Sequence, residues 1–309
     1  MPDSNFQIGA FYKFFHFPQF AEYRGSLFKQ ARELSITGSL LLAHEGVNGT
    51  LAGPPGAVAA LIGSIEKLPG AAPIEVKWSF SATCPFYRLK VRLKKEIVTF
   101  GVGELLPEAQ VGEYVEPKDW NALISDPEVM VIDTRNAYEV RLGKFRRAID
   151  PETESFREFS SFVDEQLDPS KTRKVAMYCT GGIRCEKATA YLHRKGFEGV
   201  YHLRGGILKY LEEIPPEESL WEGECFVFDQ RVSVGHALRP GDLDLCGGCR
   251  EPLTEEDRAL PGYERGVSCH QCVDQLSDEK KAGARERQRQ IELAKARGDR
   301  HLGSSLDGR

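Results

Sequence analysis

The segment Lys174-Val175-Ala176-Met177-Tyr178-Cys179-Thr180-Gly181-Gly182-Ile183-Arg184-Cys185 decides the fold of the central part of this 309-residue chain. Its first half is a short apolar run, which is typical of a buried strand. Two glycines then interrupt the run, and a helix is predicted to begin near Cys185. A second apolar strand is predicted at residues 129–133, again followed by a loop and a helical pattern. This alternation predicts a parallel sheet with helices on both of its faces.

Cys179 stands where the predicted strand meets the loop. Gly181 and Gly182 allow the loop to curl, so that several backbone N–H groups can point at one sulfur atom. The following helix presents its positive N-terminal end, and the guanidinium of Arg184 adds a positive charge. Because these features favour the thiolate, we predict Cys179 and Arg184 as the catalytic residues, with a sulfur that can also carry a persulfide. The alternative is a cysteine that only packs at the end of a strand.

The other members of the predicted active-site loop are Thr180, Gly181, Gly182, Ile183 and Cys185. Cys185 has two open interpretations, a resolving thiol for Cys179 or a helix residue that faces the core. Upstream of the loop, Asp133, Arg135 and Glu139 bring opposite charges to the end of the other strand. We interpret these three residues as a buried or half-buried ion-pair network that stabilises the loop, in preference to a direct catalytic role.

Residues 1–100 carry the pattern of a domain that mixes helices and strands. The predicted order is strand, helix, two strands, helix and two more strands, at residues 7–17, 19–35, 36–51, 56–68, 74–80 and 86–99. The first six of these elements have the order β-α-β-β-α-β, which is that of a ferredoxin-like or acylphosphatase-like sandwich. Within the motif Glu45-Gly46-Val47-Asn48-Gly49-Thr50, the Asn48-Gly49 pair predicts a tight hairpin turn, because this pair readily adopts positive φ angles.

The chain is predicted to divide into five parts. These are the ferredoxin/acylphosphatase-like domain at residues 1–100, a linker at 101–114, the α/β domain with Cys179 at 115–213, a small cysteine-rich segment at 222–276 and a charged tail at 277–309. The linker is rich in glycine and proline, which is typical of a domain boundary. The tail has few large apolar residues, and we therefore predict a solvated helix or a disordered segment there.

The cysteine-rich segment contains two Cys-x-x-Cys turns, separated by nineteen residues. Two such turns that face each other can form a tetrahedral site with four sulfur ligands. The predicted ligands are Cys246, Cys249, Cys269 and Cys272. Structural zinc is the first expectation and iron the alternative. Redox-active thiols, or a set of cysteines that has lost its metal, remain open, and His270 is expected to lie on the surface.

Basic residues alternate with apolar ones over residues 87–94. In a strand, Leu89, Val91 and Leu93 would face the core. The opposite face would then present Arg88, Lys90, Arg92 and Lys94, which we call the basic stripe. The stripe could follow the phosphate backbone of RNA, or it could be an ordinary solvated sheet face. RNA is favoured if further cations share this face, the candidates being Lys144, Arg146, Arg147, Arg184 and Arg204.

The composition of the chain limits the class of protein and the compartment that can be expected. Hydrophobic residues make up 41% of the chain and charged residues 28%, as in soluble globular proteins. No window is apolar enough to span a membrane, and the N-terminus lacks the features of a secretory signal, so we expect a cytoplasmic protein with no membrane partner. In such a chain, eight cysteines indicate metal binding and catalysis more than disulfides. The net charge of −5 excludes no function, because grouped basic residues still allow RNA binding.

Three segments resemble those of rhodanese domains, over about residues 115–212. They are Asp133-Thr134-Arg135-Asn136-Ala137-Tyr138-Glu139, the loop from Cys179 to Arg184, and Leu203-Arg204-Gly205-Gly206-Ile207. One departure is Gly143-Lys144-Phe145, where many rhodanese domains have Gly-His-Ile. Four features together resemble the rhodanese-domain tRNA uridine-34 hydroxylases, over about residues 6–275. They are the acylphosphatase-like domain, the motif at residues 45–50, the loop Cys-Thr-Gly-Gly-Ile-Arg-Cys-Glu-Lys at residues 179–187 and the cysteine-rich segment.

This resemblance implies oxygen-dependent 5-hydroxylation of the wobble uridine in tRNA, with molecular oxygen as co-substrate and Cys179 as the key residue. No flavin, haem or 2-His-1-carboxylate site is evident in the sequence, and an unseen cofactor or a reactive sulfur species could activate oxygen. The residues alone indicate sulfur transfer instead, and the alternative is a thiosulfate-type sulfurtransferase that carries a persulfide on Cys179. A third possibility is a zinc-stabilised binding module whose loop only binds an anion.

Overall fold

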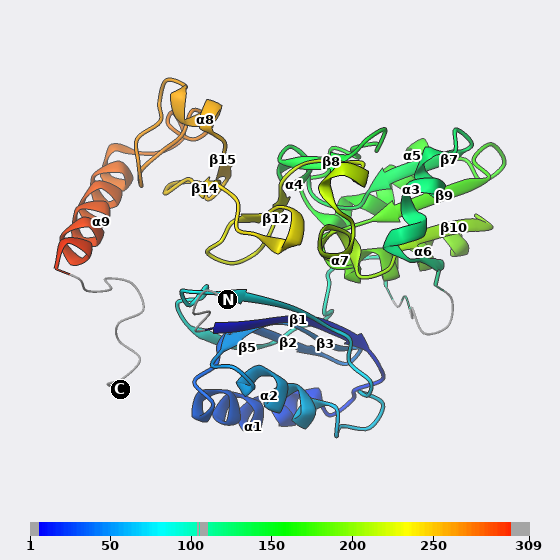
Figure 1. The fold of residues 1–309 in the computed structure, drawn as a ribbon, viewed down its shortest axis with the longest axis horizontal. Coiled ribbons are helices and arrows are strands. Elements are labelled where there is room, and N and C mark those ends of the chain that lie inside the picture. The colour runs from blue at the N-terminus through cyan, green and yellow to red at the C-terminus, as the bar shows by residue number, and fades with distance from the viewer. Residues whose placement is uncertain (1–5, 104, 106–110, 298–309) are drawn as a thin grey trace. The chain divides into compact units, whose positions relative to one another are not determined.

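The computed structural model describes residues 6–103, 105 and 111–297 (Figure 1). The chain forms two compact units. The first comprises Met1–Phe226 and Val234–Arg239, and the second Val227–Ser233 and Pro240–Arg309. The N-terminal domain and the α/β domain with Cys179 therefore belong to one unit, and the four paired cysteines belong to the other.

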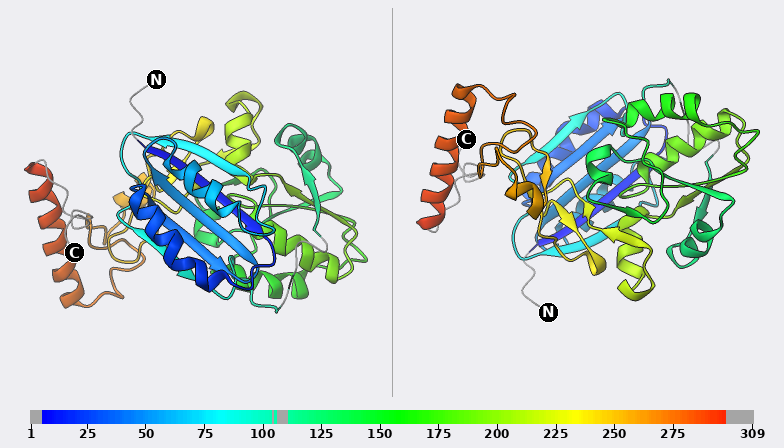
Figure 2. Two further views of the ribbon diagram at one scale, coloured as in Figure 1. Left: turned by 90° about the horizontal axis from the view of Figure 1, so that it is seen from below. Right: turned by 90° about the horizontal axis from the view of Figure 1, so that it is seen from above.

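The N-terminal domain is an α+β sandwich. Its elements are β1 (Phe6–Phe14), α1 (Phe20–Glu33), β2 (Thr37–Ala43), β3 (Gly46–Gly53), α2 (Ala57–Ile65), β4 (Val76–Ser81) and β5 (Leu89–Leu93). The sheet has the strand order β4-β1-β3-β2-β5, with β5 added parallel to β2 at one edge. Helices α1 and α2 cover one face of this sheet (Figures 1 and 2). The predicted ferredoxin-like or acylphosphatase-like fold is confirmed.

The register of the strands separates an apolar face from a polar one. Directly paired residues of neighbouring strands point to the same face of a sheet. Tyr12 pairs with Asn48, Asn48 with Leu41, and Leu41 with Arg92. The same face carries Lys77, Lys90 and Arg92, because Ala10 pairs with Lys77 and Ser39 with Lys90. We call this side, opposite the buried Phe11, Leu40 and Val91, the polar face of the N-terminal sheet.

The predicted hairpin turn at Asn48-Gly49 is wrong. Strands β2 and β3 pair up to Ala43 and Gly46, so the turn consists of the two residues between them. A Cβ on Gly46, whose φ is +133°, would lie 2.0 Å from the carbonyl oxygen of Lys13. Asn48 instead lies within β3, where its side chain donates a hydrogen bond to the carbonyl of Ile97. Contact with β1 and a distant loop thus outweighs the local turn preference.

The strand predicted at residues 86–99 is shorter, since β5 covers Leu89–Leu93. Val91 is buried and Leu89 packs against the core, as predicted. The prediction for Leu93 is wrong, because this residue is 43% exposed. It is the last residue of an edge strand, where the helices and the rest of the sheet no longer cover the apolar face.

The second domain is an α/β fold around a parallel sheet of order β6-β10-β9-β7. Its elements are β6 (Glu113–Val115), α3 (Pro117–Ser125), β7 (Val129–Asp133), α4 (Ala137–Val140), β8 (Gly143–Phe145), η1 (Phe156–Glu158), α5 (Phe159–Gln166), β9 (Lys174–Tyr178), α6 (Ile183–Arg194), β10 (Gly199–Leu203), α7 (Gly206–Glu213), η2 (Pro216–Glu218) and β11 (Trp221–Gly223). Helix α3 contacts α7, and α5 contacts α6. The predicted parallel sheet is confirmed.

The remaining elements are short, except for the last helix. They are β12 (Cys225–Phe226), β13 (Ser233–Val234), η3 (His236–Leu238), β14 (Asp244–Leu245), β15 (Pro252–Leu253), α8 (Glu255–Ala259) and α9 (Asp278–Ala296). Helix α9 falls in the predicted tail, while residues 298–309 of that tail and residues 104 and 106–110 of the predicted linker lie outside the described residues. Among the described helices, none has both the length and the apolar composition needed to cross a bilayer.

Candidate functional site

Cys179 follows β9 directly, and the loop after it enters α6 at Ile183. The side chain is buried, with 1% of the residue exposed. The backbone N–H of Gly182 donates a hydrogen bond to its sulfur at 3.1 Å, and the N–H groups of Arg184 and Cys185 also donate to it. The loop therefore directs three backbone donors at one sulfur atom, as the sequence predicted.

These donors outweigh the cost of burying a charge. Burial by itself raises the pKa of Cys179, but the thiol of Cys185, the charge of Arg184 and the backbone N–H groups lower it to about 5. Burial and the neighbouring Cys179 raise the pKa of Cys185 far above its ordinary value. These shifts favour Cys179 as the thiolate of the pair and Cys185 as the thiol. Cys185 also packs in the hydrophobic core.

Arg184 is held by Glu139 in a bidentate ion pair. Its Nη1 and Nη2 atoms lie 2.6 Å and 2.8 Å from the two carboxylate oxygens, and Nη2 also donates to the hydroxyl of Thr180. Glu139 is fully buried, and Arg184 is 8% exposed. The guanidinium thus bonds to Glu139 and acts on Cys179 only through space. This pair fixes the start of α6 and, with it, the curvature of the loop.

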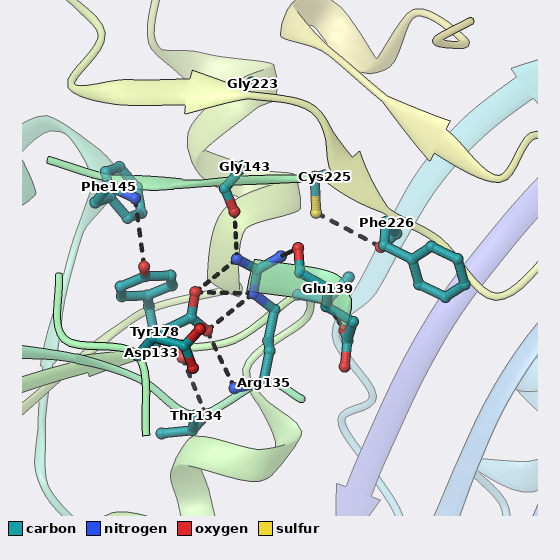
Figure 3. Close-up of polar contacts among 12 residues, drawn as sticks. Asp133, Thr134, Arg135, Glu139, Gly143, Phe145, Tyr178, Gly223, Cys225 and Phe226 are labelled. Atoms are coloured by element: carbon teal, nitrogen blue, oxygen red, sulfur yellow. Dashed lines mark hydrogen bonds and ion pairs between the residues drawn. The ribbon is translucent and has the colours of Figure 1, made fainter. Parts of the chain in front are cut away.

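A second buried pair supports the first (Figure 3). The guanidinium of Arg135 binds the carboxylate of Asp133 and donates to the backbone carbonyls of Glu139 and Gly143. It also lies 5.1 Å from the centre of the Trp221 ring. The ion-pair network predicted for Asp133, Arg135 and Glu139 is confirmed, and Arg184 is its fourth member. Glu139 and Arg184 connect this network to the loop through hydrogen bonds with the hydroxyl of Thr180.

The segment Leu203-Arg204-Gly205-Gly206-Ile207 and the residue after it form backbone hydrogen bonds to the loop. The backbone N–H of Ile207 donates to the carbonyl of Cys179 at 3.0 Å, and that of Leu208 donates to the carbonyl of Thr180 at 3.1 Å. Since the carbonyls turn towards this segment, the N–H groups of the loop are left to face the sulfur.

Only one of the two loop glycines needs to be glycine. Gly182 has a φ of +99°, and a Cβ there would lie 2.9 Å from the hydroxyl of Tyr12, whereas a Cβ on Gly181 would meet nothing. We expect Gly182→Ala to destabilise the loop by roughly 1–3 kcal/mol and to displace its N–H donor. Site-resolved alkylation of Cys179 measured against pH should then have its midpoint above the value near 5. Gly181→Ala is the matched control, and equal midpoints for both variants would contradict this account.

A pocket of about 500 Å³ adjoins the loop within the same unit. Residues of both domains line it, among them Tyr12, Phe14, Lys77, Tyr114, Glu186 and Arg204. The charge of Cys179 raises the pKa of Tyr12, Lys77 and Glu186, although Cys179 is not itself among the residues that line the pocket. No sequence pattern pointed to Tyr12, Lys77 or Tyr114, whereas Glu186 follows the predicted loop directly.

Lys187, for which the sequence analysis predicted no role of its own, forms ion pairs that connect the two domains. Its ammonium lies 2.9 Å from a carboxylate oxygen of Glu45 and 2.6 Å from one of Glu96, and it is almost fully buried. Glu45 additionally accepts a hydrogen bond from the backbone N–H of Ile97. The motif at residues 45–50 therefore helps to anchor the N-terminal domain on the helix that follows the catalytic loop.

Two family models match this arrangement. The UPF0176 acylphosphatase-like domain matches residues 6–97, and the rhodanese-like domain matches residues 116–213. The chain thus joins a UPF0176 acylphosphatase-like domain to a rhodanese-like domain. This is the architecture of the tRNA hydroxylase-like family that the sequence resembles.

Solved structures match single parts of the chain. A rhodanese-like domain from Anabaena sp. is 17% identical over 37% of this chain and 80% of its own length, with a TM-score of 0.31. A rhodanese-related protein from Thermoplasma volcanium is 24% identical over 34% and 95%, with a TM-score of 0.27. An acylphosphatase from Coxiella burnetii is 21% identical over 30% and 100%, with a TM-score of 0.24.

The second unit holds the four paired cysteines as one cluster. The sulfur atoms of Cys246, Cys249, Cys269 and Cys272 all lie within 4.8 Å of one another. The shortest separations, 3.6, 3.7 and 3.9 Å, are close to the edge of about 3.8 Å that a tetrahedron with Zn–S bonds of about 2.3 Å requires. They are far longer than a disulfide bond of about 2.0 Å. The cluster thus fits zinc, and His270 is not part of it.

Such a site is closed, because four sulfur ligands complete the shell of a tetrahedral ion. When bound, zinc would hold the surrounding short strands and turns together and would present no open position to a substrate. The assignment of a metal ligand role to the four cysteines remains a prediction from sequence that this geometry supports.

The basic stripe lies on β5 and just beyond both of its ends. Arg88, Arg92 and Lys94 are exposed, and Lys90 is partly buried. Burial and the neighbouring Arg88 and Arg92 lower the pKa of Lys90, which shows how closely the cations are spaced. In the described part of the chain none of the four forms an ion pair. Their role in RNA binding remains a prediction.

The five further cations considered in the sequence analysis do not lie on one common surface. Arg204 lines the pocket, where its guanidinium stacks on Tyr114 and pairs with Glu116. Arg184 is buried against Glu139. Arg146 pairs with Glu222, Arg147 binds backbone carbonyls and Lys144 is exposed. Only Arg204 therefore joins the cations of the N-terminal sheet at the pocket.

Proposed function

We propose that this protein hydroxylates C5 of the wobble uridine, position 34, in tRNA, with molecular oxygen as the oxidant and Cys179 as the key residue. The observation that carries the proposal is the pocket beside the Cys179 loop, which residues of the acylphosphatase-like domain help to line. Its volume of about 500 Å³ suits a small ring such as a nucleobase. The match to both family domains supports the same activity.

The roles of the protein groups follow from their positions. Cys179 is the reactive sulfur, kept anionic by three backbone donors, and Arg184 stabilises that charge from its pair with Glu139. Hydroxylation replaces the C5–H bond of the base with C5–OH. One oxygen atom of O₂ enters the base, and the other leaves as water after accepting two electrons and two protons, so that a reductant must also be supplied.

The RNA would be held by the polar face of the N-terminal sheet. Lys77, beside the pocket, and Lys90 and Arg92 of the basic stripe share this face. Four strand spacings of about 4.8 Å place β5 on the order of 19 Å from β4. The stripe would therefore bind phosphates several nucleotides away from the base in the pocket. We place this activity in the cytoplasm.

Nucleoside mass spectrometry tests the proposed function. The tRNA of cells that lack this protein would be digested after complementation with wild type, Cys179→Ala or Cys84→Ala. Cys84 is a buried cysteine of the N-terminal domain and serves as the matched control. We expect 5-hydroxyuridine derivatives to return with wild type and Cys84→Ala and to stay absent with Cys179→Ala. If their level is the same whichever form of the protein is supplied, the hydroxylase proposal fails.

A thiosulfate-type sulfurtransferase is the second candidate, favoured by the rhodanese-like match and the thiolate of Cys179. In that reaction, Cys179 takes the outer sulfur of thiosulfate and releases sulfite, and cyanide then removes the sulfur as thiocyanate. Strong turnover in this assay without RNA, together with unchanged tRNA nucleosides, would select this candidate.

A further inference from the structure

Glu186 is a buried hydrogen-bond acceptor that lines the pocket. It is 5% exposed, and its carboxylate accepts hydrogen bonds from the hydroxyls of Tyr12 and Tyr114 at 2.8–2.9 Å. A carboxylate offers about four lone-pair positions, and the two phenols supply only two donor protons, that of Tyr114 being shared between both carboxylate oxygens. The two phenol donors fix the plane of the carboxylate and leave it acceptor capacity for a ligand.

Lys77 is the matching donor. Its ammonium lies 5.2 Å from the centre of the Tyr12 ring and lines the pocket. Within the described residues it forms neither an ion pair nor a hydrogen bond. Burial is the largest influence on its pKa and lowers it, whereas the charges of Glu75, which also lines the pocket, and of Cys179 and Glu186 raise it. A partly buried ammonium without a partner is costly, and a ligand carbonyl would relieve this cost.

Aromatic rings surround these two groups. Tyr12, Phe14 and Tyr114 line the pocket, and Tyr114 is held by the ring of His202 at 4.2 Å and by the guanidinium of Arg204 at 4.4 Å. Proteins that bind single-stranded RNA place splayed-out bases against such rings and form hydrogen bonds to their polar edges. A base in an anticodon loop is unpaired and can enter without melting a helix.

We propose that this pocket selects uracil by its imide edge, with Glu186 accepting a hydrogen bond from N3–H and Lys77 donating one to the O4 carbonyl oxygen. This inference deepens the proposed function and rests on it for the identity of the RNA. Cytosine has the opposite pattern, since its N3 is an acceptor and its N4 amino group a donor. It would place a lone pair against the carboxylate and an amino group against the ammonium.

Binding of two RNAs tests this selection independently of turnover. The full-length Cys179→Ala protein would be titrated with anticodon stem-loops that differ only in U or C at position 34, with fluorescence anisotropy as readout at pH 8. We expect at least about tenfold tighter binding of the U34 RNA, in line with one well-placed pair of hydrogen bonds. Glu186→Gln and Lys77→Met should each reduce this ratio below about threefold. Lys13 also lines the pocket, and Lys13→Met should weaken the binding of both RNAs equally, so that the ratio of their affinities stays the same.

Each outcome decides the proposal. Equal binding of both RNAs to the parent protein, or a preference that survives both substitutions, overturns it, as does failure of the parent to bind either RNA. If Glu186→Gln does not fold, as judged by thermal unfolding, Lys77→Met alone decides. Hydroxylation in cells without any base preference in binding would refute the selection but keep the proposed function. A binding preference for the U34 RNA without cellular 5-hydroxyuridine would support the selection of uracil and refute the proposed hydroxylase function.

Discussion

Removal of bound zinc from the cluster of Cys246, Cys249, Cys269 and Cys272 is expected to unfold the segment around it. The apolar core there is very small, since besides cysteines its buried apolar residues among those described are Pro252, Leu253 and Val267. The short strands β14 and β15 and the helix α8 have few other contacts to hold them. Structural zinc contributes on the order of 10–16 kcal/mol in small domains of this kind, so its loss should not be tolerated.

Hydrogen exchange before and after chelation measures this effect. We expect one equivalent of zinc per chain, and loss of protection over residues 244–276 once the metal has been removed. Cys269→Ser should produce the same loss, whereas Cys225→Ser, at a buried cysteine outside the cluster, should not. The rhodanese-like domain should keep its protection, because it belongs to the other compact unit. Full protection of the segment in metal-free protein would contradict the structural role of the site.

Glu139→Gln is expected to lower the free energy of unfolding by about 3–5 kcal/mol, because it leaves the Arg184 guanidinium buried without its anion. The side chains of this pair are 0% and 9% exposed, so solvent cannot replace the lost partner. The same change should loosen the start of α6, which this ion pair holds.

Denaturant unfolding of matched variants measures this cost. Glu222→Gln breaks an exposed pair with Arg146, in which both side chains are about 60% exposed, and should change stability by less than about 1 kcal/mol. The double variant Glu139→Gln/Arg184→Met should recover part of the loss by removing the stranded charge. If Glu139→Gln and Glu222→Gln destabilise the protein equally, burial of the Glu139–Arg184 pair does not matter in the way that we infer.

The sequence alone determined the features that depend on neighbouring residues. The apolar run before Cys179, the two glycines after it and the Cys-x-x-Cys turns are local patterns, and the strand, the loop and the four-sulfur cluster follow them. Backbone N–H groups reach the Cys179 sulfur because they belong to the next few residues. The order of helices and strands in both domains was predictable for the same reason, since periodicity is read over short windows.

Local patterns failed where distant contacts decide. Asn48-Gly49 has a strong turn preference, yet it lies in a strand because β1 and the loop at Ile97 pack against it. Leu93 fits an alternating strand, yet it is exposed because the edge strand ends there.

Only the tertiary structure brought the pocket together. Tyr12 and Glu186 are 174 residues apart, and their hydrogen bond exists because the N-terminal sheet is docked on the rhodanese-like domain. Lys187 joins Glu45 and Glu96 across the same interface. Lys77 and the cations of the basic stripe share one face because of the strand register, which places residues from five separate strands in line. A single sequence carries no record of such pairings, because they are set by the packing of whole elements and not by the neighbours of any residue.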